Sequence, residues 1–141
     1  MIDVVCAIIF DKNKILLTQR GEHSHHAFQW EFPGGKVKPE ETEEQSIHRE
    51  IKEELEIEIE IAEKLTPVVY DYGFRKIRLV PFLCYFKKGE IILNEHKDFG
   101  WLELKDLKGK HFSGADRKLI YLPENLLLLE KYSGEKMNNA R

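Results

Sequence analysis

The sequence predicts an α/β domain in which helices pack against a mixed β-sheet. Apolar runs rich in β-branched residues recur along the chain, and two segments with helical periodicity lie among them. With 141 residues, 42% of them hydrophobic, the chain is long enough to bury one core. We therefore expect a single domain over residues 1–132 and a flexible, polar tail over residues 133–141.

The amino-terminal third begins with a predicted β-hairpin. The runs VVCAIIF (4–10) and KILLTQR (14–20) are apolar, and the residues between them have turn chemistry. A polar loop (21–29), a short aromatic segment WEFP (30–33) and a glycine- and proline-containing loop GGKVKPEE (34–41) follow. This last loop is expected to lead into a helix.

The first helix is expected to begin near Glu43. Thr42 and Gln45 have the spacing of a capping box, in which each side chain bonds a free backbone N–H of the first turn. Ile47, Ile51 and Leu55 follow at intervals of four and form one apolar stripe. The helix should therefore pack by one edge.

The second half of the chain contains most of the predicted strands. They are IEIEIAE (57–63), LTPVVYDYG (65–73), KIRLVPFLCYF (76–86) and EIILN (90–94), with a turn at residues 87–89 before the last. GWLELKDL (100–107) is predicted to be a strand that leaves the sheet. Residues 115–132 are predicted to be helical with a break near Pro123.

Composition excludes several classes of protein. A net charge of -3 with no basic block argues against a surface for duplex nucleic acid. No apolar run reaches the roughly 18 residues that cross a bilayer, and the start of the chain lacks the basic region of a signal peptide. Cys6 and Cys84 lie in strand-like runs and are expected to be buried thiols, which suits a reducing, cytoplasmic location.

Glutamates crowd beside the apolar stripe of the first helix. Glu50, Glu53 and Glu54 lie within one turn, and like charges at these spacings cost a few tenths of a kcal/mol per pair. A hard divalent cation such as Mg²⁺ would offset that repulsion, since it binds carboxylates, water and phosphate oxygens. On charge pattern alone, a solvated face helped by Arg49 and Lys52 explains the same residues.

The stretch from Gly35 to Ile57 resembles the Nudix box. That family's pattern is Gly, five residues, Glu, seven residues, Arg-Glu-aliphatic, one residue, Glu-Glu, one residue, Gly-aliphatic. Here the matching positions are Gly35, Glu41, Arg49, Glu50, Ile51, Glu53, Glu54 and Ile57. The exception is Glu56, where the family has the Gly that ends the helix. Glu56 would lower the stability of the fold by about 1 kcal/mol if it kept the left-handed conformation of that Gly. Its presence also leaves the last residue of the helix undetermined from the sequence.

The resemblance implies the Nudix fold, an α/β/α sandwich with a central mixed β-sheet, and a single Nudix hydrolase domain over residues 1–132. From residue 4 to 120 the chain is similar to the MutT-like branch of the family. Within this range, WEFPGGK (30–36) resembles the segment that leads into the box in that branch. Arg20 matches that branch's phosphate-contacting arginine, with a surface ion pair as the alternative. His25 matches a histidine of the substrate loop, although solvated loop histidines are the default.

The resemblance also implies a set of metal ligands. The carbonyl of Gly34 and the carboxylates of Glu50 and Glu54 correspond to ligands of an essential Mg²⁺, for which Mn²⁺ is a possible substitute. Glu53 lies in or next to that shell. Glu95 matches a distant glutamate that serves as a further ligand or an alternative base, although a simple loop acid explains it too.

Catalytic roles follow from the same resemblance. Arg49 would orient the carboxylates, and Glu41 would form an ion pair with Arg49 that ties the loop to the helix. One carboxylate must accept a proton from the attacking water. Glu50 is the first choice for this base and Glu53 the second.

The implied reaction converts a nucleoside triphosphate and water to the monophosphate and pyrophosphate. Asp116 corresponds to a residue at the mouth of the base pocket, or it is an ordinary N-cap. An ionised Asp only accepts hydrogen bonds, which leaves 8-oxo-dGTP and (d)CTP open as substrates. Phe32, Phe74 and Phe82 are candidates for base stacking or for the core. The predicted substrate-binding residues are Arg20, His25, Phe32, Gly35 and Asp116.

Two other functions remain open. One is a Nudix hydrolase of ADP-ribose, a dinucleoside polyphosphate or a related nucleoside diphosphate derivative, whose branches usually carry further motifs that are not identified here. The other is a non-catalytic nucleotide-sensing module, whose signature would be loss of the box glutamates. The expected partner is a small-molecule nucleotide, and both a monomer and a homodimer fit the sequence.

Overall fold

The structure is a computed structural model that describes residues 1–134. Most of the predicted tail, residues 135–141, lies outside the described residues. In chain order the elements are β1 (Ile2–Asp11), β2 (Lys14–Gln19), β3 (Trp30–Glu31), β4 (Gly34–Lys36), α1 (Glu43–Leu55), β5 (Glu58–Lys64), β6 (Val68–Asp71), β7 (Lys76–Lys88), β8 (Asp98–Leu102), the 3₁₀ helix η1 (Leu104–Gly109), α2 (Gly114–Tyr121) and α3 (Pro123–Ser133).

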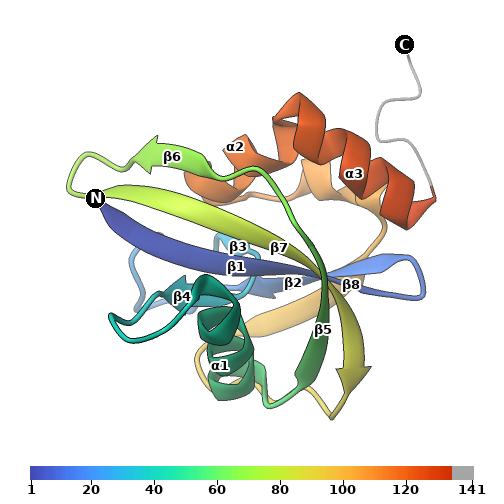
Figure 1. Ribbon diagram of the computed structural model, residues 1–141. Helices are drawn as coiled ribbons and strands as arrows, with labels where there is room; N and C mark the ends of the chain where they lie inside the picture. The colour runs from blue at the N-terminus through green and yellow to red at the C-terminus, as the bar shows by residue number, and fades with distance from the viewer. Residues whose placement is uncertain (135–141) are drawn as a thin grey trace.

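All of these strands belong to one mixed sheet. The main path runs β3-β2-β1-β7-β5, while β4 pairs with β1, β6 with β7 and β8 with β2. The long β1–β7 pairing is parallel, from Ile2 opposite Ile77 to Phe10 opposite Tyr85, and the other pairings are antiparallel. Figure 1 shows β1 and β7 side by side at the centre of the molecule. The predicted mixed sheet is confirmed.

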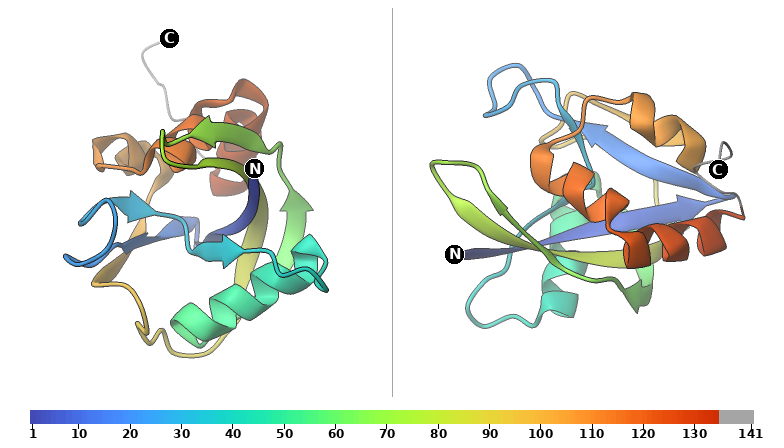
Figure 2. Two further views of the ribbon diagram at one scale, coloured as in Figure 1. Left: turned by 90° about the vertical axis from the view of Figure 1, so that its left-hand side faces the viewer. Right: turned by 90° about the horizontal axis from the view of Figure 1, so that it is seen from above.

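Alternate residues of β1 serve two cores on opposite faces of the sheet. Val5, Ala7 and Ile9 belong to the cluster that contains the apolar stripe of α1. Cys6 and Ile8 belong to the cluster that contains residues of α2 and α3. Figure 2 shows α1 on one side of the strands and α2 and α3 on the other. The fold is therefore the predicted α/β/α sandwich.

Several local predictions are confirmed. The first hairpin turns at Lys12 and Asn13, whose φ angles of 51° and 66° suit a two-residue turn. Thr42 and Gln45 form both bonds of the capping box, and α1 begins at Glu43. Pro123 occupies the start of α3, which accounts for the break after α2.

Three segment predictions are wrong in whole or in part. Residues 90–94 are not a strand, because their N–H groups bond the end of α1: Ile92 N–H donates to the Leu55 carbonyl and Asn94 N–H to the Glu54 carbonyl. The loop 34–41 begins with a strand, β4, because residues 34–36 pair with β1. The strand predicted at 100–107 is confirmed only for residues 100–102: β8 pairs with β2 and ends at Leu102, and residues 104–107 belong to η1.

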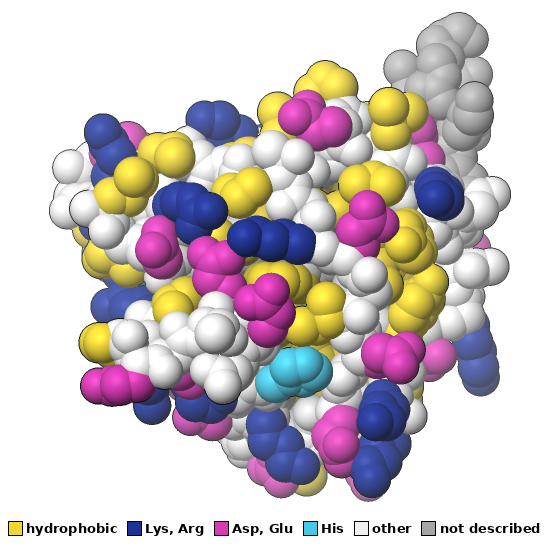
Figure 3. All heavy atoms as spheres, viewed as in Figure 1, with side chains coloured by type: hydrophobic (Ala, Val, Ile, Leu, Met, Phe, Trp, Pro, Cys, Tyr) yellow, Lys and Arg dark blue, Asp and Glu magenta, His cyan; other side chains and the backbone are white. Residues whose placement is uncertain are grey.

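The prediction for the two thiols agrees with the structure. Cys6 and Cys84 are free and buried, as expected, and burial raises the pKa of both thiols, that of Cys84 to about 12. Basic and acidic side chains alternate over the face shown in Figure 3. Within residues 1–134, no helix is long and apolar enough to cross a membrane.

Candidate active site

A cleft of about 560 Å³ lies where β1, β4 and the carboxyl end of α1 meet the loops before β3, β7 and β8. It collects predicted site residues from five separate parts of the chain. Those that line it are Arg20, His25, Phe32, Gly34, Gly35, Glu54, Glu95 and Asp116. The other predicted site residues on α1, Arg49, Glu50 and Glu53, are not among the lining residues.

Glu54 is the buried carboxyl group on the helix side of the cleft, with 6% of the residue exposed. Its Oε1 accepts a hydrogen bond from the Gly34 N–H at 3.1 Å. The carboxyl group of Glu95, which lines the same cleft, lies close enough to act on that of Glu54. The pKa of Glu54 is raised to about 10, mainly by burial and further by the neighbouring carboxyl groups of Glu95 and Glu50. Several carboxyl groups therefore converge on one poorly solvated position.

Two glycines permit this convergence. A Cβ atom at Gly34 would lie 1.9 Å from the Val5 carbonyl oxygen, so only glycine lets β4 pair closely with β1. A Cβ atom at Gly35 would lie 2.4 Å from Cδ of Glu50. The Glu50 carboxylate therefore packs directly against the backbone of the loop that lines the cleft.

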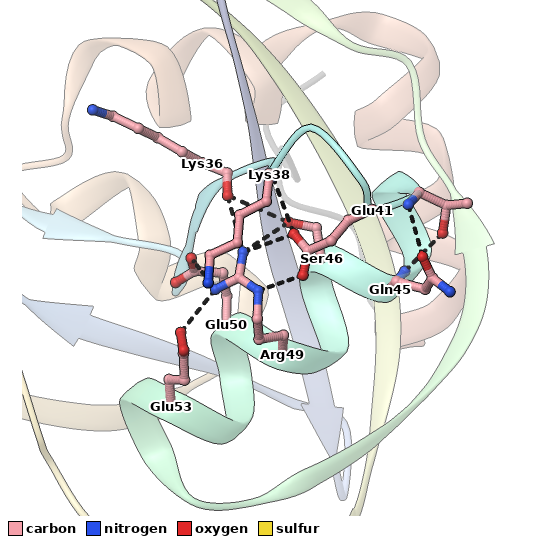
Figure 4. Close-up of polar contacts among 9 residues, drawn as sticks. Lys36, Lys38, Glu41, Gln45, Ser46, Arg49, Glu50 and Glu53 are labelled. Carbon is pink, nitrogen blue, oxygen red and sulfur yellow. Dashed lines mark hydrogen bonds and ion pairs between the residues drawn. The ribbon is translucent and has the colours of Figure 1, made fainter.

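Arg49 joins the acidic side chains of the loop and of α1 (Figure 4). Its guanidinium bonds both carboxylate oxygens of Glu41, through Nε and through Nη2 at 2.9 Å. Its Nη1 donates to Glu50 and Glu53, each at 2.8 Å. Hydrogen bonding to Arg49 lowers the pKa of Glu41 to about 2. The predicted Glu41–Arg49 ion pair is therefore present, and Arg49 also touches two of the predicted catalytic glutamates.

The donor set fits a hard divalent cation in its chemistry. Among residues 1–134 no three His, Cys, Asp or Glu side chains already meet in a metal-binding arrangement. Glu54 nevertheless has the carboxyl groups of Glu95 and Glu50 near it, and their negative charges disfavour ionisation of Glu54. A bound cation would offset this repulsion and stabilise the ionised carboxylates. Carboxylate oxygens are the ligands that Mg²⁺ prefers. The residues present thus suit Mg²⁺, and their roles as ligands stay predictions.

Asp116 is the buried carboxyl group on the opposite side of the cleft. Its Oδ2 accepts from the Phe32 N–H at 2.7 Å, and its Oδ1 from the Ser113 hydroxyl at 2.8 Å. Burial, followed by the charge of Glu31, raises the pKa of Asp116 to about 7. The expectation that Asp116 only accepts hydrogen bonds therefore applies to its ionised form, because the protonated form also donates.

Asp116 is not the N-cap of its helix. Ser113 occupies that position in α2, and Asp116 lies in the first turn with its side chain directed back to Ser113. The simple capping explanation for Asp116 is therefore wrong.

Arg20 forms the ion pair that was the alternative to phosphate contact. Its Nη1 lies 2.9 Å from Oε1 of Glu31, and its Nε donates to the His25 carbonyl at 2.7 Å. The His25 ring in turn packs edge-on against Phe74, with ring centroids 4.6 Å apart. Both side chains still line the cleft, so their contact with substrate stays a prediction.

The three phenylalanine candidates have different surroundings. Phe82 is 1% exposed in the core under α1, away from the cleft, so stacking on a base is wrong for it. Phe32 lines the cleft but is only 3% exposed, with its ring against Phe112. Phe74 is 60% exposed at the tip of the β6–β7 hairpin and also lines the cleft.

Sequence reasoning missed several residues of the cleft. Glu31 bonds both Arg20 and the ring Nε2 of His96, the latter at 3.0 Å. The Tyr72 hydroxyl lies 3.2 Å from the Ser113 hydroxyl and accepts from a backbone N–H of α2. No spacing links these positions in the sequence. The one available signal was that His96 follows Glu95.

Comparisons with known proteins agree with this geometry. Residues 2–122 match the family model described as "NUDIX domain". Over 120 residues the chain is 36% identical to a "CTP pyrophosphohydrolase" of Escherichia coli (strain K12), covering 85% of this chain and 89% of that protein. Over 119 residues it is 35% identical to an "8-oxo-dGTP diphosphatase" of Buchnera aphidicola subsp. Schizaphis graminum (strain Sg), covering 84% and 90%. The solution structure of the E. coli ORF135 protein aligns with a TM-score of 0.74 at 32% identity, covering 93% of this chain and 91% of that one.

Proposed function

This chain belongs to the Nudix family and is a hydrolase of phosphoanhydride bonds, and from that premise we propose a Mg²⁺-dependent nucleoside triphosphate pyrophosphohydrolase. Its products would be the nucleoside monophosphate and pyrophosphate. The observation that carries the proposal is that one cleft holds the Glu54–Glu95 carboxyl pair on one side and Asp116 with Phe32 on the other. A nucleoside triphosphate has a polyphosphate end and a base end that suit these two sides.

The metal would be held by the Gly34 carbonyl and by Glu50, Glu54 and Glu95, with Glu53 beside them. When bound, Mg²⁺ neutralises phosphate charge and lowers the pKa of a bound water. Arg49 fixes the rotamers of Glu50 and Glu53 through hydrogen bonds of 2.8 Å. Arg20 supplies a positive charge at the cleft wall for the phosphates.

Glu50 is the preferred proton acceptor. Its side chain is 16% exposed and packs against Gly35 of the cleft loop. The side chain of Glu53 is 53% exposed and lies one turn farther along the outer face of α1. A base must lie within hydrogen-bond reach of the attacking water, and this requirement favours Glu50, whose carboxylate lies against a lining residue of the cleft, Gly35.

The base side suits two substrates. Asp116, when ionised, accepts a hydrogen bond from the amino group of cytosine or from N7–H of 8-oxoguanine. The named relatives include a protein for each of these nucleotides at similar identity, so we propose 8-oxo-dGTP or (d)CTP as the substrate. The enzyme would act on the cytoplasmic nucleotide pool, as the free thiols suggest, as a monomer or a homodimer.

A nucleotide panel tests the proposal. Pyrophosphate release is measured with Mg²⁺ for 8-oxo-dGTP, dGTP, CTP, dCTP and, as a non-triphosphate control, ADP-ribose, with a parallel set in chelator. We expect kcat/KM to be highest for 8-oxo-dGTP or for a cytosine nucleotide, and to be lost in chelator. Equal turnover of ADP-ribose and the triphosphates would reject the substrate class.

A further inference from the structure

The carboxyl end of α1 has an unusual residue for its conformation. Glu56 adopts φ 57° and ψ 33°, the left-handed conformation, and its N–H bonds the Lys52 carbonyl. Glycine adopts this conformation without steric cost, whereas an L residue is strained. A glutamate at this position therefore calls for a compensating contact.

Residues 90–96, which we call the strap, cross this helix end. The Ile92 N–H donates to the Leu55 carbonyl at 3.0 Å, and the Asn94 N–H to the Glu54 carbonyl at 3.1 Å. Nδ2 of Asn94 donates to the Glu53 carbonyl at 2.8 Å and to Oε2 of Glu56 at 3.0 Å. The strap thus satisfies the carbonyl groups that a helix leaves free at its carboxyl end.

Asn94 is the point at which the strap is held most firmly, through both its backbone and its side chain. The next residue, Glu95, lines the cleft together with Glu54 and acts on its carboxyl group. The residue after that, His96, contacts Glu31 at 3.0 Å. The attachment of Asn94 to the helix end therefore determines where Glu95 enters the carboxyl cluster.

The turn before the strap is built for this crossing. Gly89 has φ 116°, and a Cβ atom there would approach the Glu56 carbonyl oxygen to 3.1 Å. Glycine lets the chain turn from β7 directly beneath the helix end. A glycine at position 56 would fit the helix but would offer no side chain to Asn94.

We propose that Glu56 and Asn94 form a positioning pair, in which the Glu56 carboxylate orients the Asn94 amide and so holds Glu95 against Glu54 for metal binding. The inference rests on the proposed function, because it assigns Glu95 to the metal site. Glycine at position 56 would adopt the left-handed conformation without strain. Glutamate is strained there but provides a side-chain hydrogen bond to the strap.

Mn²⁺ binding to the nucleotide-free protein, followed by electron paramagnetic resonance, tests the pair. Asn94→Ala removes both amide bonds and should raise the Kd for Mn²⁺ about three- to tenfold, as loss of one or two hydrogen bonds implies. Glu56→Gly should raise it about two- to threefold. Glu56→Gln, which keeps an acceptor oxygen, should bind Mn²⁺ within about twofold of the unmodified protein. Glu90→Gln, an exposed change in the same strap, is the matched control.

Thermal stability separates positioning from a general structural role. Glu56→Gly relieves the left-handed strain, so its Tm should equal or exceed that of the unmodified protein while its Mn²⁺ binding weakens. A merely structural contact would move both quantities in the same direction. If both Glu56→Gly and Asn94→Ala bound Mn²⁺ with the affinity of the unmodified protein, this inference would be overturned and the proposed metal site would stand. No Mn²⁺ binding by the unmodified protein would overturn the proposed metal site and this inference with it.

Discussion

Glu54 and Asp116 are buried to the same extent on opposite sides of the cleft, each with 6% of the residue exposed, yet their surroundings differ. Burial raises the pKa of Glu54 to about 10, and the neighbouring carboxyl groups of Glu95 and Glu50 add to the shift. Asp116 accepts hydrogen bonds from Phe32 and Ser113, which offset part of its burial, and its pKa is raised only to about 7.

This difference indicates what each side of the cleft lacks. The Asp116 carboxyl has a hydrogen-bond donor for each oxygen within the protein, so it is held in place without a ligand. The carboxyls around Glu54 repel one another, and a cation would change that repulsion into binding. We call the side of the cleft with Glu54, where we propose that the metal binds, the metal side, and the side with Asp116, where we propose that the base binds, the base side. The metal side should be sensitive to any change in its charges, and the base side should respond mainly to protonation of Asp116.

The largest effect is expected for Glu50→Gln on the metal side. Gln keeps an oxygen that can accept from Arg49, but it neither accepts a proton nor offers a charge to the metal. We expect kcat to fall about 10³-fold, within the range that a general base contributes, with an unchanged circular dichroism spectrum. Steady-state pyrophosphate release measures the loss.

Glu53→Gln is the matched comparison for that variant. Because Glu53 is half exposed on the outer face of α1, we expect a smaller loss than for Glu50→Gln. A larger loss at Glu53 would transfer the role of base to that residue. Normal activity in Glu50→Gln would reject the metal-side assignment.

Arg49→Lys should have an intermediate effect. Arg49 bonds Glu41 through two nitrogens while a third contacts Glu50 and Glu53, a geometry that a single ammonium group cannot reproduce. Loss of such an orienting partner typically costs 10- to 100-fold, and we expect kcat to fall by roughly that factor. The KM for the nucleotide should change less.

Glu41→Gln provides the control for the loop side of the same network. It weakens the tie between the loop and α1 but leaves the contacts of Arg49 with Glu50 and Glu53 in place. The Tm should fall while kcat changes less than in Arg49→Lys. If both variants lost the same activity, Arg49 would act through loop stability and not by orienting the glutamates.

The helix that carries Glu50, Glu53 and Glu54 was predictable because its residues follow one local period, whereas their role as metal ligands, with Gly34 and Glu95, came from the resemblance and stays a prediction. The capping box at Thr42, the stripe through Ile51 and the glutamates beside it are all consequences of helical geometry, and the structure has this helix. Local reasoning also predicted a strand at residues 90–94, from a short apolar run after a turn. There the hydrogen bonds of Ile92 and Asn94 to the end of α1 prevail over strand propensity.

The base side was predictable only in part because tertiary contacts build it. The bond from Phe32 to Asp116 joins residues 84 positions apart, and that from His96 to Glu31 joins residues 65 apart. Periodicity carries no information at such separations. The resemblance marked Asp116, but only the fold revealed that Tyr72 and Ser113 fix the helix turn that carries it.

The smallest effect concerns the pH dependence of stability, which isolates the base side without substrate. The pKa of Asp116 is about 7 in the folded protein and 3.8 ordinarily, so the folded state holds this proton more tightly. That contribution to stability is complete below about pH 4 and is lost as the pH rises towards 7. Relative to Asp116→Asn, the unmodified protein should lose about 2 kcal/mol of folding stability between pH 5 and 7.

Asp116→Asn is a suitable reference because its amide can keep both contacts. Its oxygen can accept from the Phe32 N–H, and its nitrogen can donate to the Ser113 hydroxyl, whose proton can then turn to Tyr72. Urea unfolding of both proteins at pH 5, 6 and 7 measures the difference. Parallel curves would mean that Asp116 is already ionised at pH 5, because the hydrogen bonds from Phe32 and Ser113, with the charge of Arg20, would then outweigh burial and the repulsion from Glu31. In that event the carboxylate would only accept hydrogen bonds from the base, which would return Asp116 to the role that the sequence first indicated.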